Sequence, residues 1–126
     1  MEPLSLTSSV FTQVVKRLQR DDRNGYFAEP VDPVALGIPH YTKIITSPMD
    51  LGTIERKLRE GKYTENSQVG DDIQLVFTNA IKFNEPTNPV HMSAKSLLVS
   101  FHRYFSQLQG NSRPQAKRAS DPGDGP

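Results

Sequence analysis

The positions of the prolines decide which parts of this chain can be long helices. The ten prolines fall at position 3, between positions 30 and 48, at positions 86 and 89, and near the C-terminus. A proline inside a helix removes a backbone hydrogen bond and clashes with the preceding turn. Long helices are therefore restricted to the three proline-free segments, and each of these shows the apolar spacing of an amphipathic helix.

The spacing of apolar residues predicts four helices, at residues 6–21, 51–59, 66–83 and 90–108. Asp50 is placed to cap the second helix, and Gly61 to end it. The first helix has three candidate caps, which are Thr7, Ser8 and Ser9. No segment shows the alternation of a β-strand, so we expect an all-α fold in which four helices form an antiparallel bundle.

The segment between the first two helices, residues 22–48, is too long and too apolar for an ordinary linker. Its 27 residues include four prolines, and loops of this length are uncommon inside compact domains. It carries nine large apolar side chains: Tyr26, Phe27, Val31, Val34, Leu36, Ile38, Tyr41, Ile44 and Ile45. Leaving these in water would cost about 25 cal/mol per Å². We therefore expect the loop to be ordered and to pack on the bundle as an apolar wall suited to a ligand.

Asn84 interrupts the apolar face of the helix at 66–83. Continuing the pattern of Phe77 and Ala80 brings an amide to a position where an apolar residue is expected, and Pro86 prevents the helix from continuing. Two interpretations stay open at this point. Asn84 is either only the end of a helix, or an amide whose hydrogen-bonding groups are left for a ligand.

Three stretches of the sequence resemble the bromodomain family, whose members bind acetylated lysine. The stretch PHYTKIITSPMDLGTIERKLREGKY at 39–63 is similar to the family's Pro-x-Tyr and Pro-Met-Asp motifs and the helix that follows them. FTNAIKFN at 77–84 resembles the segment that ends in the acetyl-lysine-binding asparagine, and EPVDPVALGIPHY at 29–41 resembles a pocket-wall loop. The likeness covers about residues 9–108. It implies a left-handed antiparallel four-helix bundle with a long ordered loop between helices 1 and 2.

The resemblance implies roles for ten positions in an acetyl-lysine pocket. Asn84 would donate its amide N–H to the acetyl oxygen, and Tyr41 would hold that oxygen through a water molecule. The walls would be formed by Phe27, Pro30, Val31, Leu36 and Ile38 on the loop side, and by Ala80, Phe83 and Val90 on the other, with Val90 at the rim.

The chain departs from the family pattern at several positions. Gly25 and Tyr26 stand where many members have Trp and Pro, so the outer apolar shelf is either smaller or partly replaced by Tyr26. Phe83 and Thr42 stand where Tyr is frequent. These differences leave open which residues are preferred beside the acetyl-lysine.

The chemistry of the ten positions favours a neutral ligand. An unmodified lysine would bury its charge, and none of the ten positions holds an acidic residue to pair with it. Acetylation removes that charge and leaves one good acceptor on an aliphatic stem. We expect the Asn84 amide to meet this acceptor because it has no partner in its own protein.

An enzyme and a scaffold are the two alternatives to an acetyl-lysine-binding module. For an enzyme, His40, His91 and His102 lack metal-ligand spacing, and Asp71 and Asp72 are adjacent and point to different sides of a helix. We therefore expect no catalysis, no cofactor and no metal. The second alternative is a scaffold that binds partners through its helix surfaces.

Charge and composition limit the partners. Residues 1–109 carry 12 Lys and Arg against 12 Asp and Glu, so we expect at most weak and secondary binding of nucleic acid. No apolar run is long enough to cross a membrane. We expect a flexible N-terminus at 1–5, the bromodomain at 6–109 and a disordered tail at 110–126. The resemblance implies a monomeric, nuclear, chromatin-associated reader of acetylated histone tails or other acetylated proteins.

Overall fold

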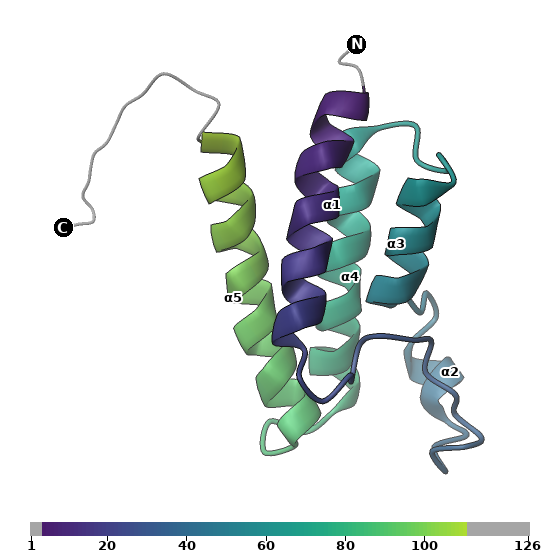
Figure 1. Ribbon diagram of the computed structural model, residues 1–126. Coiled ribbons are helices and arrows are strands. Elements are labelled where there is room, and N and C mark those ends of the chain that lie inside the picture. The colour runs from purple at the N-terminus through teal and green to yellow at the C-terminus, as the bar shows by residue number, and fades with distance from the viewer. Residues whose placement is uncertain (1–3, 111–126) are drawn as a thin grey trace, which may run out of the picture.

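The computed structural model describes residues 4–110, and every regular element in that range is a helix. The helices are α1 (Leu4–Asp21), α2 (Tyr41–Ile44), α3 (Leu51–Arg59), α4 (Asn66–Phe83) and α5 (Pro89–Gly110). Apart from the one-turn α2, they lie side by side and alternate in direction along the chain (Figure 1). Helix α1 contacts α3, α4 and α5. The predicted all-α four-helix bundle is confirmed.

The helix ends follow local chemistry, with one exception. Helices α3 and α4 begin and end at the predicted residues. Asp50 caps α3 by accepting a hydrogen bond from the backbone N–H of Thr53, 2.8 Å away, and Gly61 follows its end with a φ of 68°. The predicted cap at Thr7, Ser8 or Ser9 is wrong. Helix α1 begins at Leu4 and continues through all three, because no proline or glycine interrupts it there.

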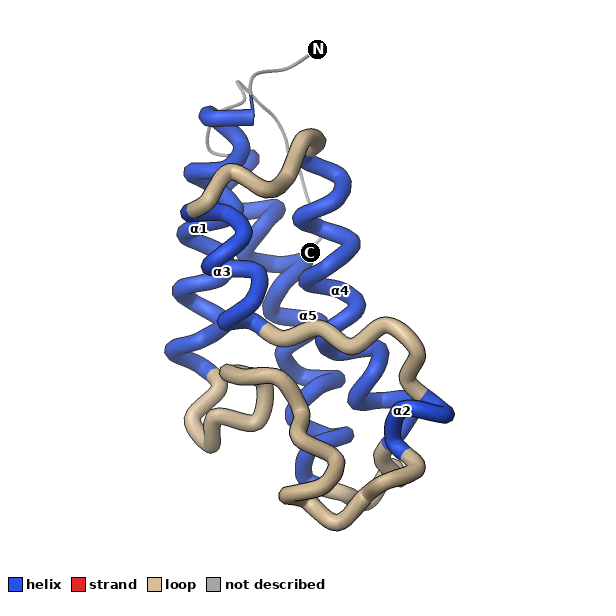
Figure 2. Tube along the Cα trace, turned by 90° about the vertical axis from the view of Figure 1, so that its right-hand side faces the viewer, coloured by secondary structure: helices blue, strands red, loops and turns tan. Residues whose placement is uncertain are grey.

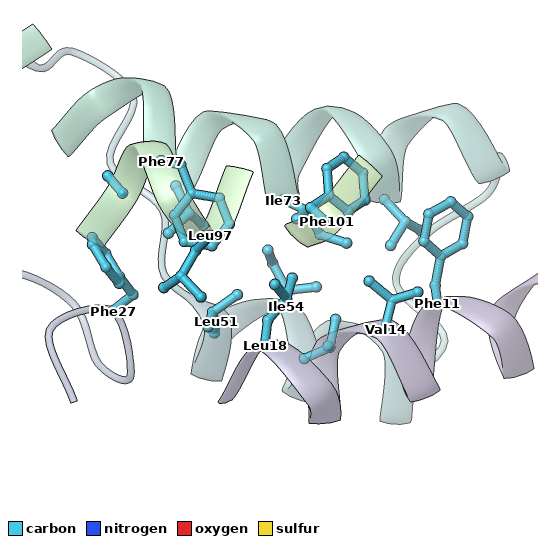
Figure 3. Packing of buried hydrophobic residues seen from close by; sticks show 14 of the residues in the cluster. Phe11, Val14, Leu18, Phe27, Leu51, Ile54, Ile73, Phe77, Leu97 and Phe101 are labelled. Carbon is cyan, nitrogen blue, oxygen red and sulfur yellow. The ribbon is translucent and has the colours of Figure 1, made fainter. Parts of the chain in front are cut away.

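Apolar side chains from α1, α3, α4 and α5 fill one continuous core (Figure 3). Leu51, Ile54 and Phe77 are fully buried in it. Phe27 joins the core from the loop and lies at the end of the row, beside Phe77 (Figure 3). The two rings meet edge to face with centroids 5.2 Å apart. The core therefore extends under the loop.

The loop between α1 and α3 folds over one end of the bundle and contains α2 (Figure 2). Helix α2 was not predicted, because four residues are too few to show a period. The expected packing is confirmed for Phe27, Tyr41 and Ile45, which are buried. It is wrong for Val34 and Leu36, which are 85% and 63% exposed, and for Ile44, which is 38% exposed. The turns around Val34 and Leu36 satisfy their own backbone groups, for example Leu36 N–H to the Asp32 oxygen at 3.0 Å.

Parts of the predicted ends of the chain lie outside the described residues. Residues 1–3 and 111–126 are not described, so the expected disorder of the tail stays a prediction. Between residues 4 and 110, no helix has both the length and the apolar character that crossing a membrane requires.

Candidate binding pocket

The first half of the loop is held against the N-terminus of α3. The carboxylate of Asp22 accepts a hydrogen bond from the backbone N–H of Phe27, 2.9 Å away. The N–H of Leu51 donates to the Phe27 oxygen at 2.8 Å, and that of Gly52 to the Ala28 oxygen at 3.2 Å. A side chain at Gly52 would place its Cβ 2.4 Å from the Ala28 oxygen. Glycine is therefore required for this close approach.

The second half of the loop is held against α4 by Asn79. Its buried side chain donates through Nδ2 to the backbone oxygen of Ser47, 2.9 Å away. Asn79 was not predicted from the sequence as a functional residue. The available signal was a polar residue directly between the buried face positions Phe77 and Ala80.

A pocket of about 730 Å³ lies between the loop, the end of α4 and the start of α5. All ten residues predicted from the sequence line it: Phe27, Pro30, Val31, Leu36, Ile38, Tyr41, Ala80, Phe83, Asn84 and Val90. The structure thus brings the whole predicted set together. Their individual roles in ligand binding stay predictions.

An aromatic group forms one side of the pocket. The buried ring of Tyr41 meets Phe83 edge to face, with centroids 4.8 Å apart. The ring of His40 lies 5.4 Å from that of Phe83, outside the lining. Burial raises the pKa of the Tyr41 hydroxyl above its usual value. The hydroxyl therefore stays protonated at neutral pH and can donate a hydrogen bond.

Asn84 follows the last turn of α4 in an extended conformation, with φ −98° and ψ 143°. Its backbone N–H and its side-chain Nδ2 both donate to the Ala80 oxygen, at 3.1 and 3.0 Å. The expectation that this amide lacks any partner in its own protein is wrong. Because a primary amide carries two N–H groups, one remains for a ligand.

The remaining nine lining residues are Gly25, Tyr26, Ala28, Glu29, Asp32, Ala35, Met49, Asp50 and Val76. Three of them are acidic, so the absence of acids at the ten predicted positions does not extend to the complete lining. Asp50 is buried, and its two oxygens accept from the Thr53 N–H and hydroxyl at 2.8 and 2.7 Å. Glu29 and Asp32 are exposed. They neighbour the predicted Pro30 and Val31, which was the sequence signal that could have revealed them.

The family model described as Bromodomain matches residues 11–96. The chain belongs to the bromodomain family. As a bromodomain, it is an acetyl-lysine-reading module of the kind found in chromatin and transcription proteins. Tyr26 lines the pocket of this bromodomain, at the position where the sequence lacks the family's frequent Trp-Pro shelf.

The chain is similar to one solved structure in fold, and to two longer proteins in sequence. The second bromodomain of Candida albicans Bdf1, bound to an imidazopyridine, is 34% identical with a TM-score of 0.73, over 79% of this chain and 96% of that one. Bromodomain-containing factor 1 of Saccharomyces cerevisiae is 39% identical over 90% of this chain and 17% of its own length. Transcription factor GTE1 of Arabidopsis thaliana is 44% identical over 75% of this chain and 25% of its own. The chain thus spans a quarter or less of either relative.

Proposed function

We propose that the pocket binds the side chain of acetylated lysine, with Asn84 as its direct polar anchor. One observation supports this proposal. The Asn84 amide donates one N–H to the Ala80 oxygen and keeps a second N–H free to donate to a ligand. Asn84 also lines the same pocket as the protonated hydroxyl of Tyr41. The acetyl oxygen would accept from Asn84 directly and from Tyr41 through a water molecule. Water-mediated bonds of this kind are nearly as favourable as direct ones.

The pocket favours the acetylated over the charged form of lysine. Apolar side chains such as Val31, Ile38 and Val90 suit the aliphatic stem. An ammonium group inside the pocket would lose its hydration. Asp50 is the buried acid of the lining, and its oxygens already accept from the backbone N–H and the hydroxyl of Thr53. An unmodified lysine would therefore find little there to replace the water it loses.

The mouth of the pocket favours a basic partner. Glu29 and Asp32 are exposed there, while none of the described residues that line the pocket is lysine, arginine or histidine. Complementary charge speeds association and orients the partner. An acetylated lysine with basic neighbours, as in a histone tail, fits this arrangement.

The names of two relatives support a proposal for the setting of the module. One relative is named a subunit of the SWR1 complex in Schizosaccharomyces pombe, at 38% identity over 82% of this chain, and another a transcription factor. These names support a nuclear, chromatin-associated parent protein. Within it, we expect this module to act as a monomer by binding alone, without catalysis. The balance of 12 Lys and Arg against 12 Asp and Glu in residues 1–109 supports only a secondary role for nucleic acid.

The test is a titration of the wild-type protein, Asn84→Ala and Tyr41→Phe with an acetylated peptide and its unmodified form. Asn84→Ala should weaken binding of the acetylated peptide by about 1–3 kcal/mol, because the acetyl oxygen would be buried without a donor. Tyr41→Phe should weaken binding of the acetylated peptide by a smaller amount, because water molecules in the pocket can rearrange. Calorimetry or NMR chemical-shift titration measures both.

Asn24→Ala is the control, because Asn24 is exposed and lies outside the pocket lining. It should bind like the wild type. Undiminished binding by Asn84→Ala would refute the assignment of the anchor. Equal binding of the unmodified peptide, or no shifts at the pocket with either peptide, would instead favour a scaffold that contacts partners through its helices.

A further inference from the structure

His91 is a buried side chain that the binding step described above does not use. It is the third residue of α5, follows Val90 directly, and is 8% exposed. Its Nδ1 lies 2.7 Å from the backbone oxygen of Asn84. A carbonyl oxygen only accepts hydrogen bonds, so Nδ1 must carry the proton and donate it. This geometry fixes the protonation of Nδ1.

The bond from His91 acts where the backbone of Asn84 is no longer held by a helix. Asn84 lies beyond the end of α4, and its two bonds to the Ala80 oxygen hold its N–H and its side chain. Its own carbonyl lies on the other side of the residue, toward the connection to α5. The His91 bond is the contact that ties this carbonyl to α5.

The start of α5 is itself well fixed, so His91 is a firm support. The side chain of Asn88 accepts a hydrogen bond from the Val90 N–H at 2.7 Å, which caps the helix just before Pro89. Proline suits the first position of a helix because its missing N–H would have no partner there. Helix α5 packs on α4 along the bundle. The position of His91 is thus set by the capped first turn of α5 and by the packing of α5 on α4.

We propose that His91 is a positioning residue for acetyl-lysine binding. It holds the Asn84 carbonyl so that the second Nδ2 hydrogen of the amide is aimed into the pocket before the ligand arrives. Preorganisation of this kind raises affinity by reducing what must be ordered on binding. The inference rests on the proposed role of Asn84, and His91 itself need not touch the ligand.

The test uses two substitutions of His91 and one control. His91→Phe keeps a flat ring but removes the donor, and should weaken binding of the acetylated peptide about tenfold. His91→Asn places an amide nitrogen close to the position of Nδ1, and should recover affinity to within about threefold of the wild type. His102→Phe changes an exposed histidine of the same helix and should bind like the wild type.

A double-mutant cycle separates positioning from a general loss of stability. If His91 acts through the Asn84 side chain, His91→Phe should have little further effect on affinity in the Asn84→Ala background. The side-chain NH₂ signals of Asn84 in the unliganded protein should also move in His91→Phe and return in His91→Asn. If His91 had a merely structural role, His91→Phe would weaken peptide binding equally in the wild-type and Asn84→Ala backgrounds. His91→Asn would then not restore affinity.

Each outcome decides between the two proposals. Wild-type affinity in His91→Phe, or additive losses in the cycle, overturns the role of His91 while leaving Asn84 as the anchor. Wild-type affinity in Asn84→Ala overturns the anchor itself. If the His91 variants do not fold, the ring-nitrogen chemical shifts of the wild-type protein decide, because a neutral ring with a bare Nδ1 has no proton to donate.

Discussion

At Asn84 and Asp50, the polar atoms of the pocket are partly used by the protein's own backbone. Asn84 donates one amide hydrogen to the Ala80 oxygen, and the two Asp50 oxygens accept from the N–H and hydroxyl of Thr53. What remains for a ligand is one Asn84 amide hydrogen and the Tyr41 hydroxyl, whereas the exposed charges of the lining are those of Glu29 and Asp32. The neutral polar groups of the pocket and the exposed charges of its lining thus belong to different residues.

The role of Glu29 can be tested with two acetylated peptides that differ only in having lysine or glutamine beside the acetyl-lysine. Glu29→Gln should reduce the preference for the lysine-flanked peptide by about 0.2–1 kcal/mol, because the pair is exposed to solvent. Raising the salt concentration should reduce the preference of the wild type in the same way. Calorimetric titrations measure both effects.

Glu60 provides the matched control, since it is exposed and lies outside the pocket lining. Glu60→Gln should keep the wild-type preference. If Glu29→Gln also keeps it, the carboxylate of Glu29 does not read the neighbouring residue.

The N-terminus of α3 is the element that holds the loop wall in place. Its capping carboxylate, Asp50, lines the pocket, and the amides of Leu51 and Gly52 bond to the loop at Phe27 and Ala28. The first turn of a helix has N–H groups without helical partners. Here some of them serve the loop, so the fold of α3 and the shape of the pocket depend on each other.

Gly52→Ala tests the contact between α3 and the loop, and a second glycine substitution serves as the comparison. Gly52→Ala should destabilise the protein by about 1–3 kcal/mol, because its Cβ would lie 2.4 Å from the Ala28 backbone oxygen. It should also weaken peptide binding, since Ala28 lines the pocket. Denaturant unfolding and peptide titration measure the two effects.

Gly70→Ala, inside α4, is the comparison. The nearest atoms to its added Cβ would be in the Phe11 ring, 3.9 Å away, an ordinary contact. It should therefore stabilise the protein by about 0.5–1 kcal/mol through helix propensity. If Gly52→Ala were as stable as Gly70→Ala, the close approach at Ala28 would not constrain the loop.

At the scale of the whole molecule, polar clusters at the edge of the apolar core join pairs of helices. Between α3 and α4, the Asp72 carboxylate accepts from the Tyr63 hydroxyl at 2.7 Å and from Lys57 Nζ at 2.9 Å. Between α1 and α5, the Tyr104 hydroxyl donates to Asp21. Burial raises the pKa of Asp21, but the bonds from Tyr104 and Arg20 outweigh it, and the net pKa is lowered.

Tyr63 should make the free energy of unfolding fall at alkaline pH. Burial, and then the bond to Asp72 and its charge, raise the pKa of Tyr63 well above the ordinary 10.0. The folded state keeps the proton that the unfolded state releases, so this contribution is present below about pH 10 and is lost as the pH rises above it. Tyr63→Phe should therefore show a shallower fall in unfolding free energy above about pH 10, by up to 1.4 kcal/mol per pH unit.

Denaturant unfolding at several pH values measures this slope in the wild type and in Tyr63→Phe. Tyr63→Phe should be less stable at neutral pH, because it loses the bond to Asp72. Identical slopes in the two proteins at alkaline pH would mean that Tyr63 releases its proton equally well in the folded state.

Much of the fold and of the pocket could be predicted from the sequence because the signals were local. The bounds of α3 follow from the spacing of its apolar residues, from the cap Asp50 and from Gly61 just after its end. The end of α4 follows from its apolar spacing and from Pro86. The ten lining residues follow from motifs that resemble a known family. Helix α2 could not be predicted in this way, because one turn is shorter than the period that reveals a helix.

The tertiary structure decided which atoms meet across long separations. Asn79 bonds to Ser47 from 32 positions away, and His91 bonds to the Asn84 carbonyl across the connection between α4 and α5. The exposure of Val34 and the acids in the lining also depend on the path of the loop. Residue type and spacing determine what a segment can bury, but only the folded path determines which polar atoms remain for a ligand.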